Sequence, residues 1–376
     1  MINLKKFSVA LLLLPFYQIT IGQTKSINVV TTAVPFLRVS PDAKSGGMGT
    51  TGIATTPDIN AVYYNNAKIP FLTSKAQVSA NYSPWLKEWG KDMYLASMAA
   101  YYKLSEDEAI HCHLRYFNPG DLKFIDDKGN YLQTYKPNEF AIDLGYSRKL
   151  SEKIGVGLGL KYIRSDLAKG TQNGQNLKPA NAIAADLGFY YNLRNSNNEG
   201  WAVGASLTNL GSGISYSNDE SFKSFIPANL GIGVSYYKII NEQNVLNVGL
   251  DINKLLVPTQ PVEGDSVALV SYKNKSTVNS WVSSFSDAPG GFREELREFQ
   301  ISAGAEYWYN NQFAIRAGYF YENKYKGDRS FFSAGAGVKY NVITVNFSYL
   351  AATTKGTIKS PLSNTLQFGV IMEIKK

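Results

Sequence analysis

Two histidines are the first residues in this sequence whose types and spacing could bind a metal. His111 and His113 flank Cys112, and residues i and i+2 of a strand share a face, so both imidazoles could coordinate zinc. A closed site needs further ligands, and these are the only histidines in the chain. The lone cysteine also excludes an intramolecular disulfide. We interpret the histidines as polar residues on one strand face, and we predict no metal and no cofactor.

Other patterns that could support catalysis are equally incomplete. The glycine run Gly155-Val-Gly-Leu-Gly159 lacks the spacing of a dinucleotide-binding loop and falls inside a strand pattern. Two pairs of adjacent carboxylates, Glu294-Glu295 and Asp126-Asp127, fall in polar loops. There they are expected to be solvated rather than paired for acid–base work. We therefore predict no catalytic residues and no enzyme activity.

Alternation of apolar residues is the dominant pattern from residue 76 to the end. About fourteen short segments follow it. In one of the clearest, Leu246, Val248, Leu250 and Ile252 alternate with Asn247, Gly249 and Asp251. Successive side chains of a strand point to opposite faces, so each segment has one apolar face and one small or polar face. The pattern predicts an all-β fold, a transmembrane antiparallel β-barrel over residues 76–376 with its apolar face toward lipid.

The composition agrees with a barrel and excludes other classes. Only 18% of the 376 residues are charged, against about a quarter in ordinary globular proteins, and there are 25 tyrosines and 32 glycines. No stretch after residue 22 has the roughly 18 uninterrupted apolar residues of a transmembrane helix. The net charge of +8 comes from scattered basic residues, so we predict no nucleic-acid partner.

The N-terminus indicates export. Lys5 and Lys6 precede an apolar run at residues 7–16, and the small residues Thr20 and Gly22 stand before Gln23. This arrangement predicts a signal peptide over residues 1–22. Together with the strand pattern, it predicts the outer membrane as the location of the protein.

Aromatic residues and connection lengths predict the orientation of the barrel. Tyrosines at the expected periplasmic ends of strands should form an aromatic girdle: Tyr146, Tyr190, Tyr236, Tyr307 and Tyr340. Connections at these ends are short, whereas those at the opposite ends are long, and the longest covers residues 255–297. Short periplasmic turns and long extracellular loops are the rule for outer-membrane barrels.

A barrel of about fourteen strands is too wide to be filled by its own side chains. Residues 23–75 precede the first strand and lack strict alternation, so we predict that they form a plug in the lumen. Glycine permits close approach of backbones, and the predicted plug residues are Gly46, Gly47, Met48, Gly49, Gly52 and Asn65. A disordered periplasmic tail is the alternative.

Two stretches resemble a known family. Thr32 to Gly49, with Gly52 to Asn60 and Tyr64 to Lys68, is similar to the N-terminal signature of the PorV family, which belongs to the FadL-like barrels. The segment Asp287-Ala-Pro-Gly-Gly-Phe-Arg-Glu-Glu-Leu296 also resembles a PorV segment. One departure is Asn66, where the family pattern usually has proline.

The resemblance implies a role in the type IX secretion system of Bacteroidota. It implies binding to the C-terminal signal domain of exported cargo, proximity to a giant translocon barrel (SprA/Sov-like), delivery to a surface attachment complex, and contact with outer-membrane lipid. Trp281, Phe285, Pro289 and Phe292 of the longest loop are the predicted contact residues, since large apolar side chains on exposed loops often bind partners. Packing of this loop onto its own barrel rim is the alternative. The competing function is a FadL-like channel for hydrophobic small molecules.

Overall fold

The computed structural model describes residues 29–84, 92–125, 129–167, 170–172, 175–217, 223–261, 266–353 and 364–374. The predicted signal peptide, residues 1–22, and the first plug residues, 23–28, lie outside the described residues.

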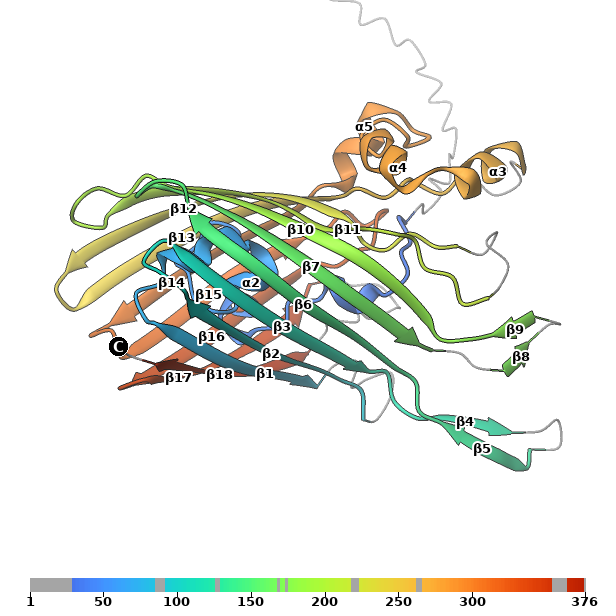
Figure 1. Ribbon diagram of the computed structural model, residues 1–376, viewed down its shortest axis with the longest axis horizontal. Helices are drawn as coiled ribbons and strands as arrows, with labels where there is room; N and C mark the ends of the chain where they lie inside the picture. The colour runs from blue at the N-terminus through green and yellow to red at the C-terminus, as the bar shows by residue number, and fades with distance from the viewer. Residues whose placement is uncertain are drawn as a thin grey trace, which may run out of the picture.

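Fourteen of the described strands form one closed antiparallel barrel (Figure 1). They are β1 (Ala76–Pro84), β2 (Tyr94–Lys103), β3 (Glu108–Asn118), β6 (Asn138–Lys149), β7 (Ile154–Asp166), β10 (Ala180–Asn192), β11 (Gly200–Gly211), β12 (Asn229–Asn241), β13 (Asn244–Leu255), β14 (Gln300–Tyr309), β15 (Phe313–Tyr321), β16 (Phe331–Tyr340), β17 (Ile343–Ala352) and β18 (Thr365–Ile374). Each pairs with its neighbours in the chain, and β1 pairs with β18, from Ala76 opposite Ile374 to Tyr82 opposite Phe368. The predicted fourteen-stranded barrel is confirmed.

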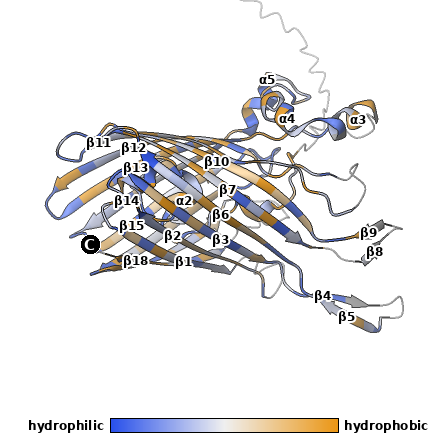
Figure 2. Ribbon diagram, viewed as in Figure 1, coloured by the Kyte–Doolittle hydropathy of each residue, from blue (hydrophilic) through white to orange (hydrophobic). Residues whose placement is uncertain are grey.

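Alternation along the strands separates a lipid face from a lumen face. In β13, Leu250 is 41% exposed, whereas the adjacent Asp251 is 1% exposed. Figure 2 shows hydrophobic and hydrophilic residues alternating in this way along the barrel strands. The apolar outer face contacts lipid, and buried apolar clusters inside the barrel pack the plug against the wall.

A cation on the lipid face tests this assignment. Leu250→Arg is expected to lower the free energy of unfolding by about 2–4 kcal/mol, because Leu250 lies midway along β13 on the lipid face. Leu246 lies on the same face near the end of the strand, so Leu246→Arg should lower the free energy of unfolding by only about 0–1 kcal/mol. Denaturant titration of folding into lipid vesicles measures both costs. Equal costs would contradict the assignment.

Connections of different length separate the two rims. We name the two rims inner and outer after the predicted orientation, and the inner rim is the one with tight turns. Asn310-Asn311 and Asn341 form two of these turns, where asparagine adopts positive φ. The outer rim carries the hairpins β4 (Leu122–Ile125) with β5 (Tyr131–Tyr135) and β8 (Gly170–Gln172) with β9 (Gln175–Leu177). It also carries the longest loop, with α3 (Ser266–Asn274), α4 (Thr277–Ser283), α5 (Phe292–Glu295) and the 3₁₀ helix η4 (Leu296–Glu298). The two hairpins and the helices of the longest loop lie at the same end of the barrel in Figure 1.

No helix in the described part of the chain is long and apolar enough to cross a membrane.

The segment before β1 lies inside the barrel (Figure 1, blue). It contains the short helices η1 (Pro35–Arg38), α1 (Ala43–Gly46), α2 (Ala61–Tyr64) and η2 (Asn66–Phe71). It starts at the outer rim, where the Ala33 N–H donates to the Phe225 carbonyl, and it ends at the inner rim, where the Lys103 ammonium donates to the Leu72 carbonyl. The chain therefore passes through the whole lumen before the first strand, and the predicted plug is confirmed for residues 29–75.

Candidate functional site: the plugged lumen and the outer-loop platform

Close backbone contact holds the glycine-rich part of the plug against the wall. Gly49 has a φ of +64°, and a Cβ at this position would lie 2.6 Å from the Tyr319 nitrogen. A Cβ at Gly47 would lie 3.0 Å from the Gly335 Cα. The Gly49 N–H donates to Ser333 Oγ at 2.8 Å, and Met48 is buried. Gly46 lies on the same stretch, where an added Cβ would collide with Gln367.

Two other predicted plug residues are held by polar contacts. Asp251 Oδ2 accepts hydrogen bonds from the N–H groups of Gly52 and Ile53, at 2.7 and 3.0 Å. The Asn65 amide donates to the carbonyls of Ile53 and Phe189, at 3.1 and 2.8 Å. The amide therefore links two parts of the plug and the strand β10.

Arg115 of β3 is the strongest single link between wall and plug. Its guanidinium donates to the carbonyls of Phe36, Leu37 and Val39, at 2.5, 3.0 and 2.7 Å, and it stacks over the Tyr63 ring at 4.6 Å. Arg115 is 1% exposed, so these carbonyls satisfy a charge that has left water. The sequence analysis missed this role, since alternation places Arg115 in the lumen but does not specify its partners.

Ion pairs fill much of the remaining lumen. Lys44 of the plug pairs with Asp58 at 2.9 Å, and Arg316 pairs with Glu306 at 2.7 Å. Lys161 lies 2.9 Å from Asp186. Charges are tolerated here because the partners are close and hydrogen-bonded within the barrel.

The two histidines lie in the lumen, and Cys112 lies on the exposed opposite face. His111 Nδ1 is 3.4 Å from Ser147 Oγ, and His113 Nδ1 is 3.8 Å from Asp143 Oδ2. Within the described residues, no group of three or more side chains could hold a metal ion.

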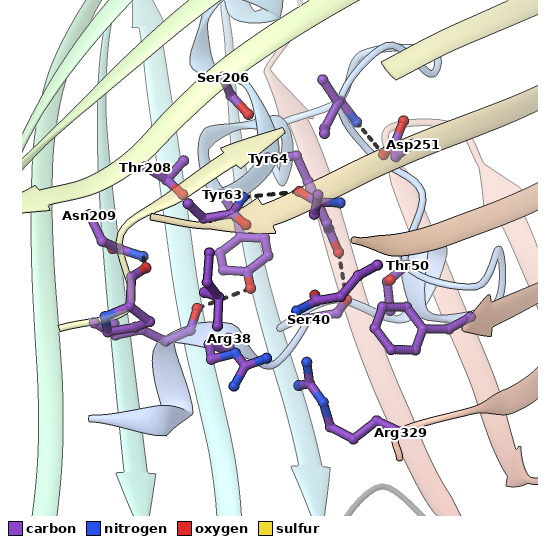
Figure 3. A pocket seen from close by; sticks show the side chains of 18 of the residues that line it. Arg38, Ser40, Thr50, Tyr63, Tyr64, Ser206, Thr208, Asn209, Asp251 and Arg329 are labelled. Carbon is purple, nitrogen blue, oxygen red and sulfur yellow. Dashed lines mark hydrogen bonds between the residues drawn. The ribbon is translucent and has the colours of Figure 1, made fainter. Parts of the chain in front are cut away.

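Among the residues that the structure describes, cavities lie on either side of the plug. One of about 110 Å³ lies toward the outer rim, and the other, of about 440 Å³, lies toward the inner rim. Arg38, Ser40, Tyr63, Tyr64 and Arg329 line the outer cavity (Figure 3). The two cavities have no lining residue in common.

A buried ion network fastens the end of the longest loop to the barrel. Lys254 of β13 pairs with Glu295 and Glu298, at 3.1 and 2.5 Å. Lys326 of the next outer loop pairs with Glu294 and Glu298, at 2.6 and 2.9 Å. Burial acts in the opposite direction, but Lys326 lowers the pKa of Glu294. The loop is thus clamped at its base.

Large apolar side chains stand exposed on this clamped loop. We call them the outer-loop platform: Val267, Leu269, Val270, Val278, Val282, Phe285, Phe292 and Leu296. Val267 is 80% exposed, and Val282 and Phe292 are each 75% exposed. Among the predicted contact residues, Phe285, Phe292 and Pro289 are exposed and Trp281 is half-buried. The sequence analysis missed the valines, although the spacing of Val278 and Val282 would place them on one face of a helix.

The predicted aromatic girdle needs one correction. Tyr146, Tyr236 and Tyr340 are exposed on the barrel wall, and Tyr307 is half-buried. Tyr190 is 1% exposed and lies in the lumen, with its ring edge-on to Phe71 of the plug at 5.1 Å. Adjacent residues of a strand point to opposite faces, so only one of a Tyr-Tyr pair can face the membrane.

Comparison with family models identifies the chain. Residues 22–262 match the model described as type IX secretion system protein PorV. The chain belongs to the PorV family. It is therefore an outer-membrane component of type IX secretion. A comparison with curated proteins finds no match.

Solved structures similar to this PorV-family barrel are FadL-like transport proteins. The toluene transporter TbuX of Ralstonia pickettii aligns with a TM-score of 0.52 at 15% identity, over 88% of this chain and 96% of its own. The toluene transporter TodX of P. putida aligns with a TM-score of 0.54 at 10% identity, over 90% and 99%. The monoaromatic hydrocarbon channel CymD gives 0.53 at 12% identity, over 90% and 98%. At these identities the likeness establishes the fold alone.

Proposed function

We propose that this PorV-family barrel binds the C-terminal signal domain of exported cargo at the cell surface. In this proposal it receives cargo from the translocon barrel (SprA/Sov-like) and passes it to the surface attachment complex. Family membership supports a role in type IX secretion, and the outer rim offers a surface on which such a transfer can occur.

The outer-loop platform is the observation that carries the proposal. Contiguous exposed apolar surface is costly in water and commonly marks a contact site for another macromolecule. Here the exposed residues come from the four short helices α3, α4, α5 and η4 of one loop, together with Phe285. Phe292 also belongs to the segment that resembles other PorV sequences.

The clamp below the platform favours binding. Lys254 and Lys326 hold Glu298 from two sides, and Thr259 also donates to Glu298 at 2.9 Å. A loop that is already ordered loses less conformational entropy when a partner docks. The platform can therefore bind a partner at a lower entropic cost.

Transport of hydrophobic compounds is the second candidate, favoured by the similarity to TbuX, TodX and CymD. A route across the lumen would have to pass the plug, and charged side chains such as Lys44, Glu306 and Arg316 line the inner cavity. These residues disfavour an apolar solute. Passage would require a large displacement of the plug.

Purification from native membranes distinguishes the two functions. A tagged full-length chain, extracted in mild detergent, is expected to bring down exported proteins that share a C-terminal domain, together with a large translocon barrel. Mass spectrometry identifies what accompanies the bait. Recovery of bound apolar small molecules without such proteins would support the channel and contradict the proposal.

A further inference from the structure

We propose that the outer cavity is a binding site for a small oxyanion, either a phosphate or a carboxylate group. The cavity lies between the plug and the barrel wall, apart from the outer-loop platform. In Figure 3 the side chains of Arg38 and Arg329 extend toward each other across one side of it.

Two guanidinium groups at this cavity share a single carboxylate. Arg329 donates to Glu322 through Nε and Nη2, at 2.7 and 2.9 Å, and Arg38 Nη2 donates to the same carboxylate at 3.0 Å. Burial opposes the effect, but Arg329 and Arg38 lower the pKa of Glu322, so this group stays ionised. Two positive charges thus face one negative charge, which leaves an excess of one positive charge.

The other charged groups near the cavity offset one another. Lys161 lines the cavity, and Asp143 and Asp186 lie 3.3 and 2.9 Å from it, which leaves one negative charge. Arg115 is bonded to backbone carbonyls and stacks on Tyr63, which lines the cavity, and its guanidinium supplies the balancing positive charge. The excess therefore comes from Arg38 and Arg329.

Asp251 lines the cavity as well and does not cancel this excess. Its Oδ2 accepts from two plug N–H groups, and it interacts electrostatically with the buried Lys68. Ser40 and Thr50 add hydroxyl groups to the polar part of the lining, and Leu37, Leu255 and Phe320 belong to its apolar part. The guanidinium and hydroxyl donors of the polar part fit a planar or tetrahedral oxyanion.

The size of the cavity admits such a ligand. Its volume of about 110 Å³ is several times the minimum that one water molecule needs, so an oxyanion group can enter. The acidic group either arrives as a free ion or is the head of a larger molecule.

Titration with inorganic phosphate at constant ionic strength tests the site in the detergent-purified full chain. Saturable binding is expected for the wild type. Arg329→Gln should weaken phosphate binding by about tenfold or more, because the substitution removes one guanidinium group. Arg329→Lys keeps the positive charge but lacks the paired N–H donors of a guanidinium, so phosphate affinity should be intermediate. Arg293→Gln, at an exposed arginine of α5, is the matched control and should bind as the wild type does.

Glu322→Gln separates ligand binding from a purely structural clamp. Removing the shared carboxylate frees both guanidiniums, so phosphate affinity should rise. If the triad served only to fasten the plug to the loop, Glu322→Gln would lower the melting temperature without creating or strengthening phosphate binding. Absence of saturable binding to the wild type, or equal binding by the Arg329→Gln and Arg293→Gln variants, would overturn the proposal.

A lipid competitor identifies the source of the acidic group. Short-chain phosphatidic acid that displaces phosphate and binds more tightly indicates a lipid headgroup. Phosphate binding that the lipid does not affect indicates a free ion. Either result supports the oxyanion site, because both require the same arginines.

Discussion

Polar substitution of the outer-loop platform is expected to abolish cargo secretion while the barrel stays assembled. Val282→Ser combined with Phe292→Ser removes two of the most exposed apolar side chains of the platform. Central aromatic and aliphatic anchors of an interface contribute about 2 kcal/mol or more each, so cargo affinity should fall by more than about a hundredfold. Secreted cargo in the culture medium, measured against the amount of barrel in the outer membrane, gives the readout.

Point substitutions suit this test better than deletion of residues 280–292 from the loop. Ser280 is buried within the loop, and the Ala288 N–H donates to the clamped Glu295 at 2.7 Å. Deletion would therefore disturb the clamp along with the platform. Val282 and Phe292 are mostly exposed, so serine at these positions removes little packing.

The matched control uses another outer element. Tyr131→Ser combined with Leu132→Ser changes two residues of the β4–β5 hairpin that are each 61% exposed. Secretion should be normal in this variant. Normal secretion by the platform variant, or equal defects in both variants, would place the cargo contact elsewhere.

Loss of the Arg115 side chain is expected to release the plug and leave the barrel folded. Arg115→Leu removes three hydrogen bonds to the carbonyls of Phe36, Leu37 and Val39. A hydrogen bond to a charged group contributes about 1.5–3 kcal/mol, and three of them are lost together. The barrel ladder of β3 with β2 and β6 is formed by backbone groups and does not depend on this side chain.

Proteolysis and conductance measure plug release together. Protease should cleave the plug in the Arg115→Leu variant but not in the wild type, and the variant should pass ions in a planar bilayer. Arg148→Leu is the control, since Arg148 is largely exposed and its 3.6 Å pair with Glu108 is a surface pair worth about 0–1 kcal/mol. A protected, non-conducting Arg115→Leu variant would mean that the remaining wall contacts suffice to hold the plug.

Sequence alone determined the strands and predicted the orientation of the barrel. Alternation identifies segments such as Leu246 to Ile252 because the period of two is a local property of extended backbone. Turn chemistry is local too, as at Asn310-Asn311, so the short and long connections could be assigned to opposite rims. The glycines of the plug also signalled close backbone contact before any partner was known.

Only the tertiary structure decided which residues meet across the lumen. Arg115 contacts carbonyls 76 to 79 positions away in the chain, and the Arg38 to Glu322 pair spans 284 positions. Such pairings depend on how the plug is threaded, which no local pattern encodes. Tyr190 shows the same limit, since tyrosine suits both the membrane boundary and a packed contact with Phe71. A residue's type and its position in a strand restrict its possible partners, whereas closure of the barrel around the plug selects one of them.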